Sequence, residues 1–526
     1  MQSILGSPYF KRYIPYVMLV IVFYFINVTQ LNYLFDYQYV RALPLLEKYL
    51  NVILCLISFF AFTFSSIYLR PKWAFVFTAI YAFNVLINVT YSRILGTLID
   101  YDSVKWMLSE VGSSQQFFVM YYRPVARGLL ITIFFLASVY LARKISLESG
   151  KHPKKGMVLA AFSILASFTA LLDPAMHRYP PPITTNFLIF SNLVWLQPGY
   201  IWQGGNVQTA KNKVGINHIL LLVDESISWE SFNKNMVAIL GHTQPISFGR
   251  ALSGANCSAS SNSILRWAAN SEQILNGKDV RANPSIWAYA KKNGFKVYYL
   301  NGQGQKISLQ NYMQKHELGL FDEAHNIDSG YQTDLAIAKN INKQWLNNPK
   351  TFTYAVLRGA HFPYTEYPPG VLNEKTATKK LQHETSVIYS KQGFFDALLS
   401  GINLKDTVII YTSDHGEVFS PNHPGHCSTA DTQIAEYFVP LLIYTSNANL
   451  QPQLLIASSA NKNHVSHFQI TPTLLLAMGY DDDYLKAQSY LTLLDEPKDT
   501  YLFKQNITPS FGAKVPAHER FEYSEN

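Results

Sequence analysis

Long apolar runs fill the N-terminal part of the chain, and shorter ones alternate with polar stretches after it. Five apolar segments lie at about residues 13–35, 47–69, 73–96, 125–143 and 156–173. Each approaches the roughly 20 residues that a helix needs to cross a bilayer. The stretch from Tyr13 to Tyr33 is apolar nearly all round, whereas a surface helix of a water-soluble protein carries a polar face. The pattern therefore predicts an N-terminal domain of five transmembrane helices over residues 1–173.

Basic residues mark alternate loops between these segments. Lys11 and Arg12 precede the first segment, Arg70 and Lys72 separate the second from the third, and residues 143–155 carry a further basic cluster. No small-residue cleavage site follows the first apolar run, so this run is expected to remain as an anchor. The positive-inside rule places the basic loops in the cytoplasm and everything after about residue 174 on the outer side.

The rest of the chain has the pattern of an α/β domain. Residues 174–212 are rich in proline, aromatic residues and glycine, which favours a linker at the membrane surface. Strand-like runs then occur at 216–223, 296–300, 351–357, 407–412 and 438–444, and helical stretches at 283–293, 333–346, 381–400 and 468–477. This alternation predicts a sheet of parallel strands flanked by helices over residues 213–526. Ligands of such sheets bind at the carboxyl ends of the strands.

Two of these strands end in acidic and histidine side chains. The run ending at Val223 continues as Asp224-Glu225-Ser226, and the run ending at Thr412 continues as Ser413-Asp414-His415-Gly416-Glu417. Each group alone is also explained by a turn or by a helix N-cap. Together they supply the oxygen and nitrogen ligands that zinc prefers, and three protein ligands with one open position are typical of catalytic zinc. We therefore predict a zinc site of Glu225, Asp414 and His415.

Other loops supply further candidate chemistry. The serine-rich segment 253–263 precedes a possible helix opening at Ile264, and a hydroxyl at a helix N-terminus is well placed to attack a phosphorus or sulfur centre. The alternative is a loop that only caps the helix. His361 and His426 lie in loops just past predicted strands, where an imidazole can stabilise phosphoryl oxygens or protonate a leaving group.

Charge and cysteine content narrow the function classes. The formal net charge is +8, but no long Lys/Arg run or recognition-helix pattern localises it, so we expect no nucleic-acid partner. Anionic lipid headgroups and solvated faces account for the charge. Of the three cysteines, Cys55 lies in an apolar run. Cys257 and Cys427 each lie beside a proposed active-site segment, which leaves open a disulfide between them in an oxidising compartment.

These features together resemble the bacterial membrane phosphoethanolamine transferases, which belong to the alkaline phosphatase and sulfatase superfamily. The resemblance covers essentially the whole chain and includes the five apolar segments. It is carried by the motifs already quoted and by Gly359-Ala360-His361-Phe362-Pro363-Tyr364 and Tyr437-Phe438-Val439-Pro440.

The resemblance implies an activity, a location and a set of site residues. Zinc would be bound by Glu225, Asp414, His415 and the nucleophile itself, and His361 and His426 would contact the phosphoryl group. The donor would be phosphatidylethanolamine, and the acceptor a hydroxyl of lipopolysaccharide (lipid A or a core sugar) or of a periplasmic glycan. We expect a monomer in the bacterial inner membrane with its catalytic domain in the periplasm.

The nucleophile is the point at which this sequence departs from the family. The family usually has Thr in a Thr-Ala-x-Ser context; Ser258-Ala259-Ser260-Ser261 matches it best, but a gapless count from Gly254 ends at Cys257. Cys257 would suit a sulfatase, yet Ala259 and Ser261 occupy the Pro and Arg positions of that signature. A hard zinc-bound alkoxide suits phosphoryl transfer, so we predict Ser258 as nucleophile.

Two other functions remain open at this stage. One is a related enzyme that transfers glycerol phosphate or hydrolyses phosphate or sulfate esters. The other is a non-catalytic protein that binds lipid or lipopolysaccharide and regulates other proteins. Because a non-catalytic relative need not keep both the ligands and the nucleophile, the presence of Glu225, Ser258, Asp414 and His415 favours an enzyme.

Overall fold

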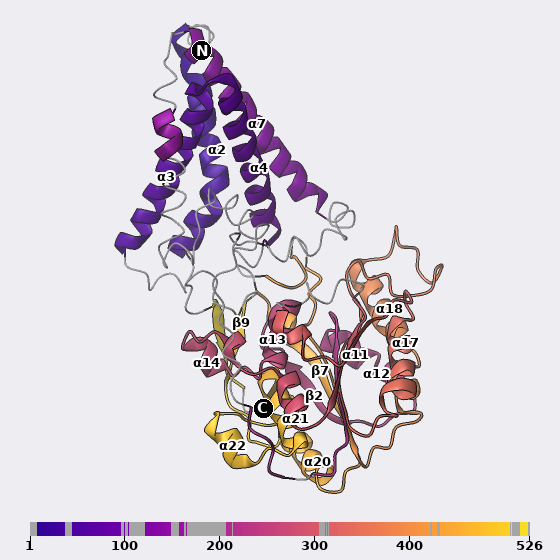
Figure 1. Cartoon of the computed structure of the whole chain (residues 1–526). Helices are drawn as coiled ribbons and strands as arrows, with labels where there is room; N and C mark the ends of the chain where they lie inside the picture. Colours follow the sequence, from indigo (N-terminus) through magenta and orange to yellow (C-terminus); the bar gives the residue numbers. More distant parts are fainter. Residues whose placement is uncertain are drawn as a thin grey trace. The chain divides into compact units, whose positions relative to one another are not determined.

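The chain divides into two units, residues 1–200 with 510–513 and residues 201–509 with 514–526. A computed structural model of the protein describes residues 8–36, 45–95, 121–148, 157–162, 207–212, 214–303, 315–420, 423–428, 432–504 and 516–523, together with a few single residues between these ranges. The two units are described separately (Figure 1). Most of the linker expected over residues 174–212 lies outside the described residues.

The first unit is helical, as the apolar segments predict. Among its described residues the long helices are α2 (Pro8–Asp36), α3 (Leu45–Tyr68), α4 (Pro71–Leu95) and α7 (Tyr122–Glu148). Within the part of the chain that the structure describes, three stretches are long and apolar enough to cross a membrane, Lys48–Tyr68, Pro71–Ile94 and Tyr122–Ser146, and a shorter apolar stretch covers Tyr13–Val28. The expected N-terminal helical domain is thus confirmed. The fifth expected segment, 156–173, lies mostly outside the described residues, although 157–162 are helical.

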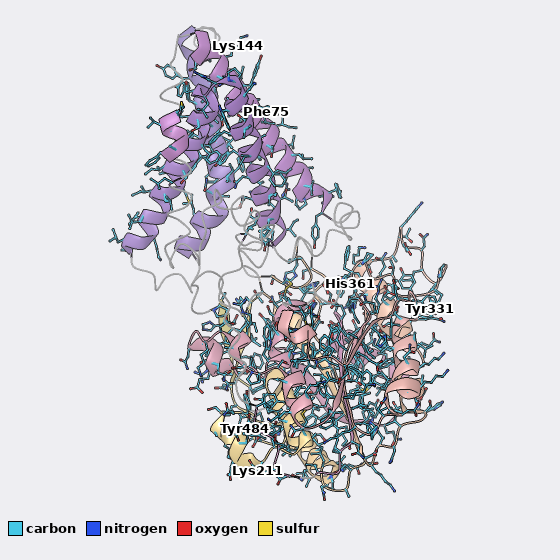
Figure 2. All side chains as sticks on the ribbon, in the orientation of Figure 1. Phe75, Lys144, Lys211, Tyr331, His361 and Tyr484 are labelled. Carbon is cyan, nitrogen blue, oxygen red and sulfur yellow. A yellow bond between two sulfur atoms is a disulfide. The ribbon has the colours of Figure 1, made fainter. Side chains whose placement is uncertain are left out.

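The helices of this unit are apolar both inside and outside. Tyr81 of α4 is buried and contacts the rings of Phe59, Phe62 and Phe135, which lie on α3 and α7. On the outside, Phe75 is 76% exposed and shows its ring to the surroundings (Figure 2). Helices that are apolar on all faces are typical of membrane spans, because lipid chains solvate the outer face.

The second unit is built on an eight-stranded sheet in the order β4-β3-β5-β1-β6-β7-β2-β8, with a separate pair β9 and β10. The strands are β1 (His218–Asp224), β2 (Ile246–Leu252), β3 (Lys296–Asn301), β4 (Glu323–Asn326), β5 (Thr351–Val356), β6 (Thr407–Ser413), β7 (Phe438–Tyr444), β8 (Val465–Ser466), β9 (Thr500–Phe503) and β10 (His518–Phe521). The five expected strands are confirmed. The expectation of parallel strands fails at β7, which pairs antiparallel with β6 and β2.

Helices connect the strands, and several of them flank this sheet. The helices described in this unit are α11 (Trp229–Lys234), α12 (Met236–Leu240), α13 (Ser258–Arg266), α14 (Ser271–Leu275), α15 (Ile286–Lys292), α16 (Lys315–Leu318), α17 (Thr333–Asn340), α18 (Lys379–Lys391), α19 (Phe394–Leu399), α20 (Gln451–Ala460), α21 (Ile470–Met478) and α22 (Asp482–Ala487). Short 3₁₀ turns occur at Val280–Ala282, Ile434–Tyr437 and His467–Gln469, and a π-helical turn at Ile341–Trp345.

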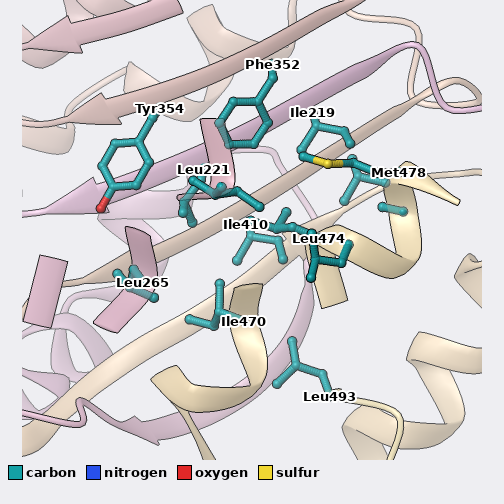
Figure 3. Close-up of a cluster of buried hydrophobic side chains, with 14 of the residues drawn as sticks. Ile219, Leu221, Leu265, Phe352, Tyr354, Ile410, Ile470, Leu474, Met478 and Leu493 are labelled. Atoms are coloured by element: carbon teal, nitrogen blue, oxygen red, sulfur yellow. The ribbon is translucent and has the colours of Figure 1, made fainter. Parts of the chain in front are cut away.

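Alternate residues of the central strand face two separate hydrophobic cores. Ile219, Leu221 and Val223 of β1 pack on the face that is covered by α15 and α21, where Leu474 and Met478 also lie (Figure 3). Leu220 and Leu222 point to the opposite face, toward residues of α11, α18 and α19. A strand buried on both faces reads as a continuous apolar run, which explains why β1 could be recognised from sequence.

The topology brings the ends of several strands to one edge of the sheet, among them those of β1, β2, β5 and β6. β1, β5 and β6 are mutually parallel. β2 runs in the same direction as β6, because β7 lies between them and is antiparallel to both. The residues that follow Asp224, Leu252, Val356 and Ser413 therefore share the carboxyl edge, where ligands bind in such sheets.

Candidate active site

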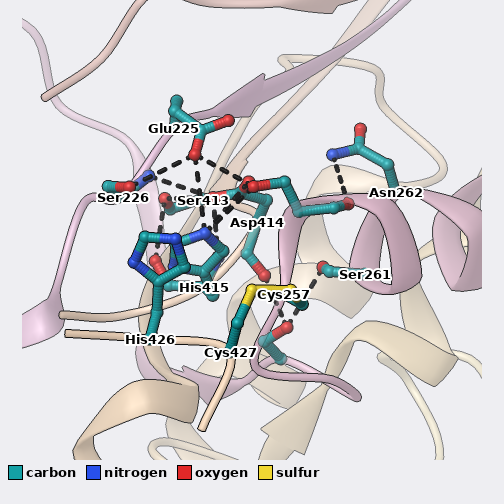
Figure 4. Close-up of polar contacts among 12 residues, drawn as sticks. Glu225, Ser226, Cys257, Ser261, Asn262, Ser413, Asp414, His415, His426 and Cys427 are labelled. Atoms are coloured by element: carbon teal, nitrogen blue, oxygen red, sulfur yellow. Dashed lines mark hydrogen bonds and ion pairs between the residues drawn. A yellow bond between two sulfur atoms is a disulfide. The ribbon is translucent and has the colours of Figure 1, made fainter. Parts of the chain in front are cut away.

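The ends of β1 and β6 are fastened to each other at this edge. Asp224 and Ser413 are opposite each other in the parallel register, so Glu225 and Asp414 follow side by side. The Asp414 N–H donates to the Asp224 carbonyl oxygen at 2.9 Å, and the Ile227 N–H donates to Ser413 Oγ at 2.8 Å. These contacts bring the two sequence-predicted acidic groups together (Figure 4).

Glu225, Asp414 and His415 form one buried cluster. Their ligand atoms all lie within 4.8 Å of one another. His415 Nε2 is 3.5 Å from both Glu225 Oε1 and Asp414 Oδ2. Asp414 Oδ1 accepts the N–H groups of Ser226 at 3.0 Å and His415 at 2.7 Å. Its other oxygen, Oδ2, is buried and has no hydrogen-bond partner among the residues that the structure describes.

The pKa values of Asp414 and His415 are both raised in this buried, acidic cluster. Burial and the neighbouring Glu225 carboxylate raise the pKa of Asp414 well above its usual range. Burial by itself lowers the pKa of His415, but Asp414 and Glu225 outweigh it and raise that pKa to about 10. Both raised pKa values show that the buried cluster favours an added positive charge, which a proton or a bound cation can supply.

A divalent cation fits this donor set. The three side chains offer two carboxylate oxygens and one imidazole nitrogen, and buried carboxylates are costly unless a cation pairs with them. Asp414 Oδ2 is the atom that lacks a hydrogen-bond partner in the described structure, and it faces His415 Nε2. His415 Nδ1, in turn, contacts the Gly416 carbonyl oxygen at 2.9 Å. Because a carbonyl only accepts, Nδ1 carries the proton and Nε2 is left to act as the ligand atom.

Ser258 lies against the same cluster. It is the first residue of α13, and its Oγ is 3.0 Å from Glu225 Oε1 and 3.1 Å from His415 Nε2. The first turn of a helix presents N–H groups that have no partner within the helix, and these suit an anionic ligand. The structure therefore brings the predicted nucleophile to the predicted metal ligands.

Cys257, the alternative nucleophile, is bonded to another residue. It forms a disulfide with Cys427. A sulfur held in a disulfide has no thiolate with which to attack, so this assignment is wrong for the bridged protein. The pairing left open by the sequence is present, and it joins the start of α13 to the loop of His426.

His361 lies on the loop after β5, at the same edge of the sheet (Figure 2). Its loop is packed on the metal-site strand: the Ala360 N–H donates to the Glu225 carbonyl oxygen at 2.9 Å. Gly359 has a φ of +60°, and a Cβ there would lie 2.3 Å from that carbonyl oxygen, so only glycine fits. His361 Nδ1 contacts the Phe362 carbonyl oxygen at 2.5 Å and therefore carries the proton. Burial raises the pKa of Glu225, but the hydrogen bond of His415 and the nearby His361 outweigh burial and lower that pKa.

His426 stacks on His415, with ring centroids 4.1 Å apart (Figure 4). Its Nδ1 is 3.0 Å from Glu417 Oε2, so Nδ1 donates to the carboxylate and Nε2 has no proton in the neutral ring. Burial raises the pKa of Glu417, but the interaction with His426 outweighs burial and lowers that pKa. His415, Glu417 and His426 form a second group of suitably placed ligand atoms.

Two residues of the site, Glu417 and Glu436, are not among those predicted from the sequence. Glu417 ends the segment that begins at Ser413, and it orients His426; its place two residues after His415 is the signal that could have indicated it. Glu436 was missed entirely. Its Oε2 accepts Asn256 Nδ2 at 2.8 Å and the Ser428 N–H at 3.1 Å, and it thus ties the start of α13 to the His426 loop.

The family profile of sulfatases matches residues 218–480. The chain belongs to the sulfatase family. The match covers β1, α13, β5 and β6, and so includes every residue placed in the site above. Its superfamily is metal-dependent, in agreement with the cation that the buried donors require. No curated protein matches the chain.

Solved structures extend the likeness beyond this domain. The integral membrane lipooligosaccharide phosphoethanolamine transferase A (EptA) from Neisseria meningitidis aligns with 97% of this chain and 99% of its own, at 14% identity and a TM-score of 0.54. The C-terminal periplasmic domain of EcEptC from Escherichia coli, solved in complex with zinc, aligns with 59% of this chain and 99% of its own, at 16% identity and a TM-score of 0.44. The match to EptA confirms the expected fold, helical membrane domain included.

Proposed function

We propose that the protein transfers phosphoethanolamine from phosphatidylethanolamine to a hydroxyl of lipopolysaccharide (lipid A or a core sugar) or of a periplasmic glycan. The observation that carries this proposal is the position of Ser258, whose Oγ lies about 3 Å from both Glu225 and His415 at the N-terminus of a nine-residue helix. A hydroxyl beside metal ligands and helix N–H groups is suited to form a covalent phosphoryl intermediate.

The membrane helices support a lipid donor. EptA is named as a phosphoethanolamine transferase, and its fold matches this chain over nearly the whole length of both proteins. Three apolar helices long enough to span a bilayer keep such an enzyme where phosphatidylethanolamine is found. The Cys257–Cys427 disulfide supports a catalytic unit in an oxidising compartment, which for a bacterial inner-membrane protein is the periplasm.

The reaction divides into two half-reactions at Ser258. In the first, Ser258 Oγ forms a bond to phosphorus while the bond from phosphorus to the diacylglycerol oxygen breaks. Ser258 gives up its proton, and the departing diacylglycerol oxygen takes one up. In the second, the acceptor hydroxyl oxygen forms a bond to phosphorus and the bond from phosphorus to Ser258 Oγ breaks. The acceptor hydroxyl gives up its proton, and Ser258 Oγ takes one up. Phosphoethanolamine is thereby moved without net consumption of water.

Glu225, Ser258, Asp414 and His415 would hold the zinc ion. When bound, zinc would supply a Lewis acid that lowers the pKa of the Ser258 hydroxyl and neutralises charge on the phosphoryl group. The N–H groups at the start of α13 contribute further stabilisation of the phosphoryl oxygens.

His361 and His426 are the proposed proton carriers. Each donates Nδ1–H to a fixed acceptor, the Phe362 carbonyl oxygen and Glu417 respectively. The Nε2 atom of each neutral ring is left able to accept a proton and return it. One proton must leave Ser258 and another must reach the leaving oxygen, so two such groups suit the reaction.

The test is incubation of the purified full chain with phosphatidylethanolamine labelled in its ethanolamine, without acceptor. We expect diacylglycerol release and label bound to the protein. Label in a water-soluble product would indicate a hydrolase instead, and an inert protein that binds no zinc would indicate a regulator. A transferase of glycerol phosphate would label only from a phosphatidylglycerol donor. Mass spectrometry of envelope glycolipids from a deletion strain would then locate the acceptor.

A further inference from the structure

Helix α18 sends two buried side chains to the segment that carries Glu225. His383 Nε2 lies 2.7 Å from the Ser226 carbonyl oxygen, and Lys391 Nζ lies 2.8 Å from Asp224 Oδ2. Both side chains are fully buried. These two contacts flank Glu225, so α18 holds the residue on each side of this predicted ligand.

The ring of His383 has one defined orientation. A carbonyl oxygen only accepts, so Nε2 donates to Ser226, and Nδ1 accepts from Ser231 Oγ at 3.2 Å. The ring also contacts Tyr364 and Phe419, at centroid distances of 5.3 and 5.0 Å. Burial lowers the pKa of His383, which favours the neutral ring with its single donor. Packing and hydrogen bonds therefore both fix the direction of Nε2–H.

Ser226 passes this constraint to the predicted metal ligands. Its φ of +58° is uncommon for a residue other than glycine and needs support from its surroundings. In this conformation its N–H donates to Asp414 Oδ1 at 3.0 Å and its Oγ donates to Glu225 Oε1 at 3.2 Å. Ser226 thus touches two ligands at once, and His383 holds its carbonyl group.

Lys391 connects the other flank to the loop of His361. It forms ion pairs with Asp224 and Asp334, both fully buried. Asp334 in turn accepts the N–H groups of Arg358 at 2.6 Å and Gly359 at 3.1 Å. The same helix therefore braces the β1 end and the loop that presents His361.

We propose that α18 is a positioning element of the metal centre, in which His383 sets the conformation of Ser226 and, through it, the directions of the Glu225 and Asp414 carboxylates. The inference rests on the proposed metal site. His383 touches no reacting atom, so it is a positioning residue. Hydrogen bonds behind metal ligands typically change metal affinity by about 10- to 100-fold.

Two substitutions separate positioning from packing. His383→Phe keeps a ring against Tyr364 and Phe419 but removes the donor, whereas His383→Gln places an amide N–H near the position of Nε2 and removes the ring. The zinc affinity of the purified full chain is measured by competition with a chelator, alongside thermal unfolding. We expect His383→Phe to weaken zinc binding about 10- to 100-fold and His383→Gln to stay near wild type.

Thr385→Ala is the matched control, because Thr385 lies on the same helix and its Oγ donates only to the Leu381 carbonyl oxygen among the contacts described. It should leave zinc affinity unchanged. The opposite order, with Gln weak and Phe unaffected, would assign His383 a packing role and overturn the proposal, as would equal affinities throughout. If His383→Phe is not recovered folded, His383→Asn replaces it, since its shorter amide does not reach Ser226.

The zinc-affinity experiment can fail or succeed independently of the test of the proposed transfer reaction. A chain that binds zinc in the expected order of variants but turns over no phosphatidylethanolamine would retain the positioning role and lose the proposed reaction. A wild-type chain that binds no zinc would overturn the metal centre and the positioning role together.

Discussion

Cys257 and Cys427 form a disulfide that joins the residue before Ser258 to the residue after His426. Their Cα atoms are 4.7 Å apart, and the bond spans 170 positions of sequence. The Cys427 N–H also donates to the Asn256 carbonyl oxygen at 2.8 Å, so backbone and side chains hold the same two segments together. The proposed nucleophile and a proposed proton carrier are thereby fixed to each other.

Replacing both cysteines, in Cys257→Ser with Cys427→Ser, should lower the free energy of unfolding by about 2–5 kcal/mol, because the long loop is no longer closed in the unfolded chain. Turnover should fall only modestly, since Ser258 and the proposed metal ligands remain. Thermal unfolding and the transfer assay measure the two effects. Dithiothreitol should lower the stability of the wild type and leave that of the double variant unchanged, because only the wild type has the disulfide to reduce. A folded, zinc-loaded double variant without turnover would restore Cys257 as a catalytic candidate.

Ser258→Ala should abolish turnover, by at least about a thousandfold, because no other hydroxyl in the described site contacts both Glu225 and His415. Thermal stability should change by only about 1 kcal/mol, the contribution of one hydrogen bond. Ser263→Ala is the control on the same helix, since Ser263 Oγ donates to the Ala259 carbonyl oxygen. Label from the donor that remains bound to Ser258→Ala would show that another residue is the nucleophile.

Zinc should raise the unfolding temperature of the wild type, because it binds only the folded arrangement of ligands. Asp414→Asn should remove most of this increase, since Asp414 Oδ2 is the buried oxygen without a partner in the described structure. In chelator the variant should be at least as stable as wild type, because one buried carboxylate is gone. An unchanged zinc response in Asp414→Asn would refute its role as a ligand.

The parts of the site that could be predicted are those that depend on short, continuous stretches of sequence. β1 and β6 are buried on both faces and appear as continuous apolar runs, so the acidic residues after Val223 and Thr412 could be placed at strand ends. That β1 and β6 are neighbours, which places Glu225 beside Asp414, is seen only in the structure. By contrast, β2 contains Gly249 and Arg250 and has a register shift. Because it forms no continuous apolar run, it could not be predicted as a strand.

The supporting contacts could not be predicted because they depend on distant segments. His383 and Lys391 lie in a helix rich in polar residues, a pattern typical of a solvent-facing helix. Both are nevertheless buried, and they contact Ser226 and Asp224, which lie far earlier in the sequence. The antiparallel direction of β7 could not be predicted, and the Cys257–Cys427 disulfide could only be left open, since neither strand direction nor Cα distance is encoded in a short window.

His467 should make the protein less stable in acid. Its Nδ1 and Nε2 contact Ser261 and Thr412, and burial, with a smaller contribution from His415, lowers its pKa from 6.5 to about 3. Between these pH values the unfolded chain binds a proton that the folded chain does not. The free energy of unfolding should therefore fall as the pH drops below about 6.5, by about 1.4 kcal/mol per pH unit from this group. His467→Gln should show a shallower slope in unfolding measured between pH 4 and 6.5; an equal slope would exclude this origin.

Lys391→Met should be among the most destabilising single changes in the second unit, by about 3–5 kcal/mol, because it leaves two fully buried carboxylates without their cation. Asp334→Asn alone should cost less, since Lys391 keeps Asp224 as a partner. The combination of Lys391→Met with Asp224→Asn and Asp334→Asn should recover much of the loss, because no buried charge then remains unpaired. Chemical unfolding of the four proteins measures the series. If the triple variant is no more stable than Lys391→Met, the loss arises from packing of the lysine side chain and not from the two uncompensated charges.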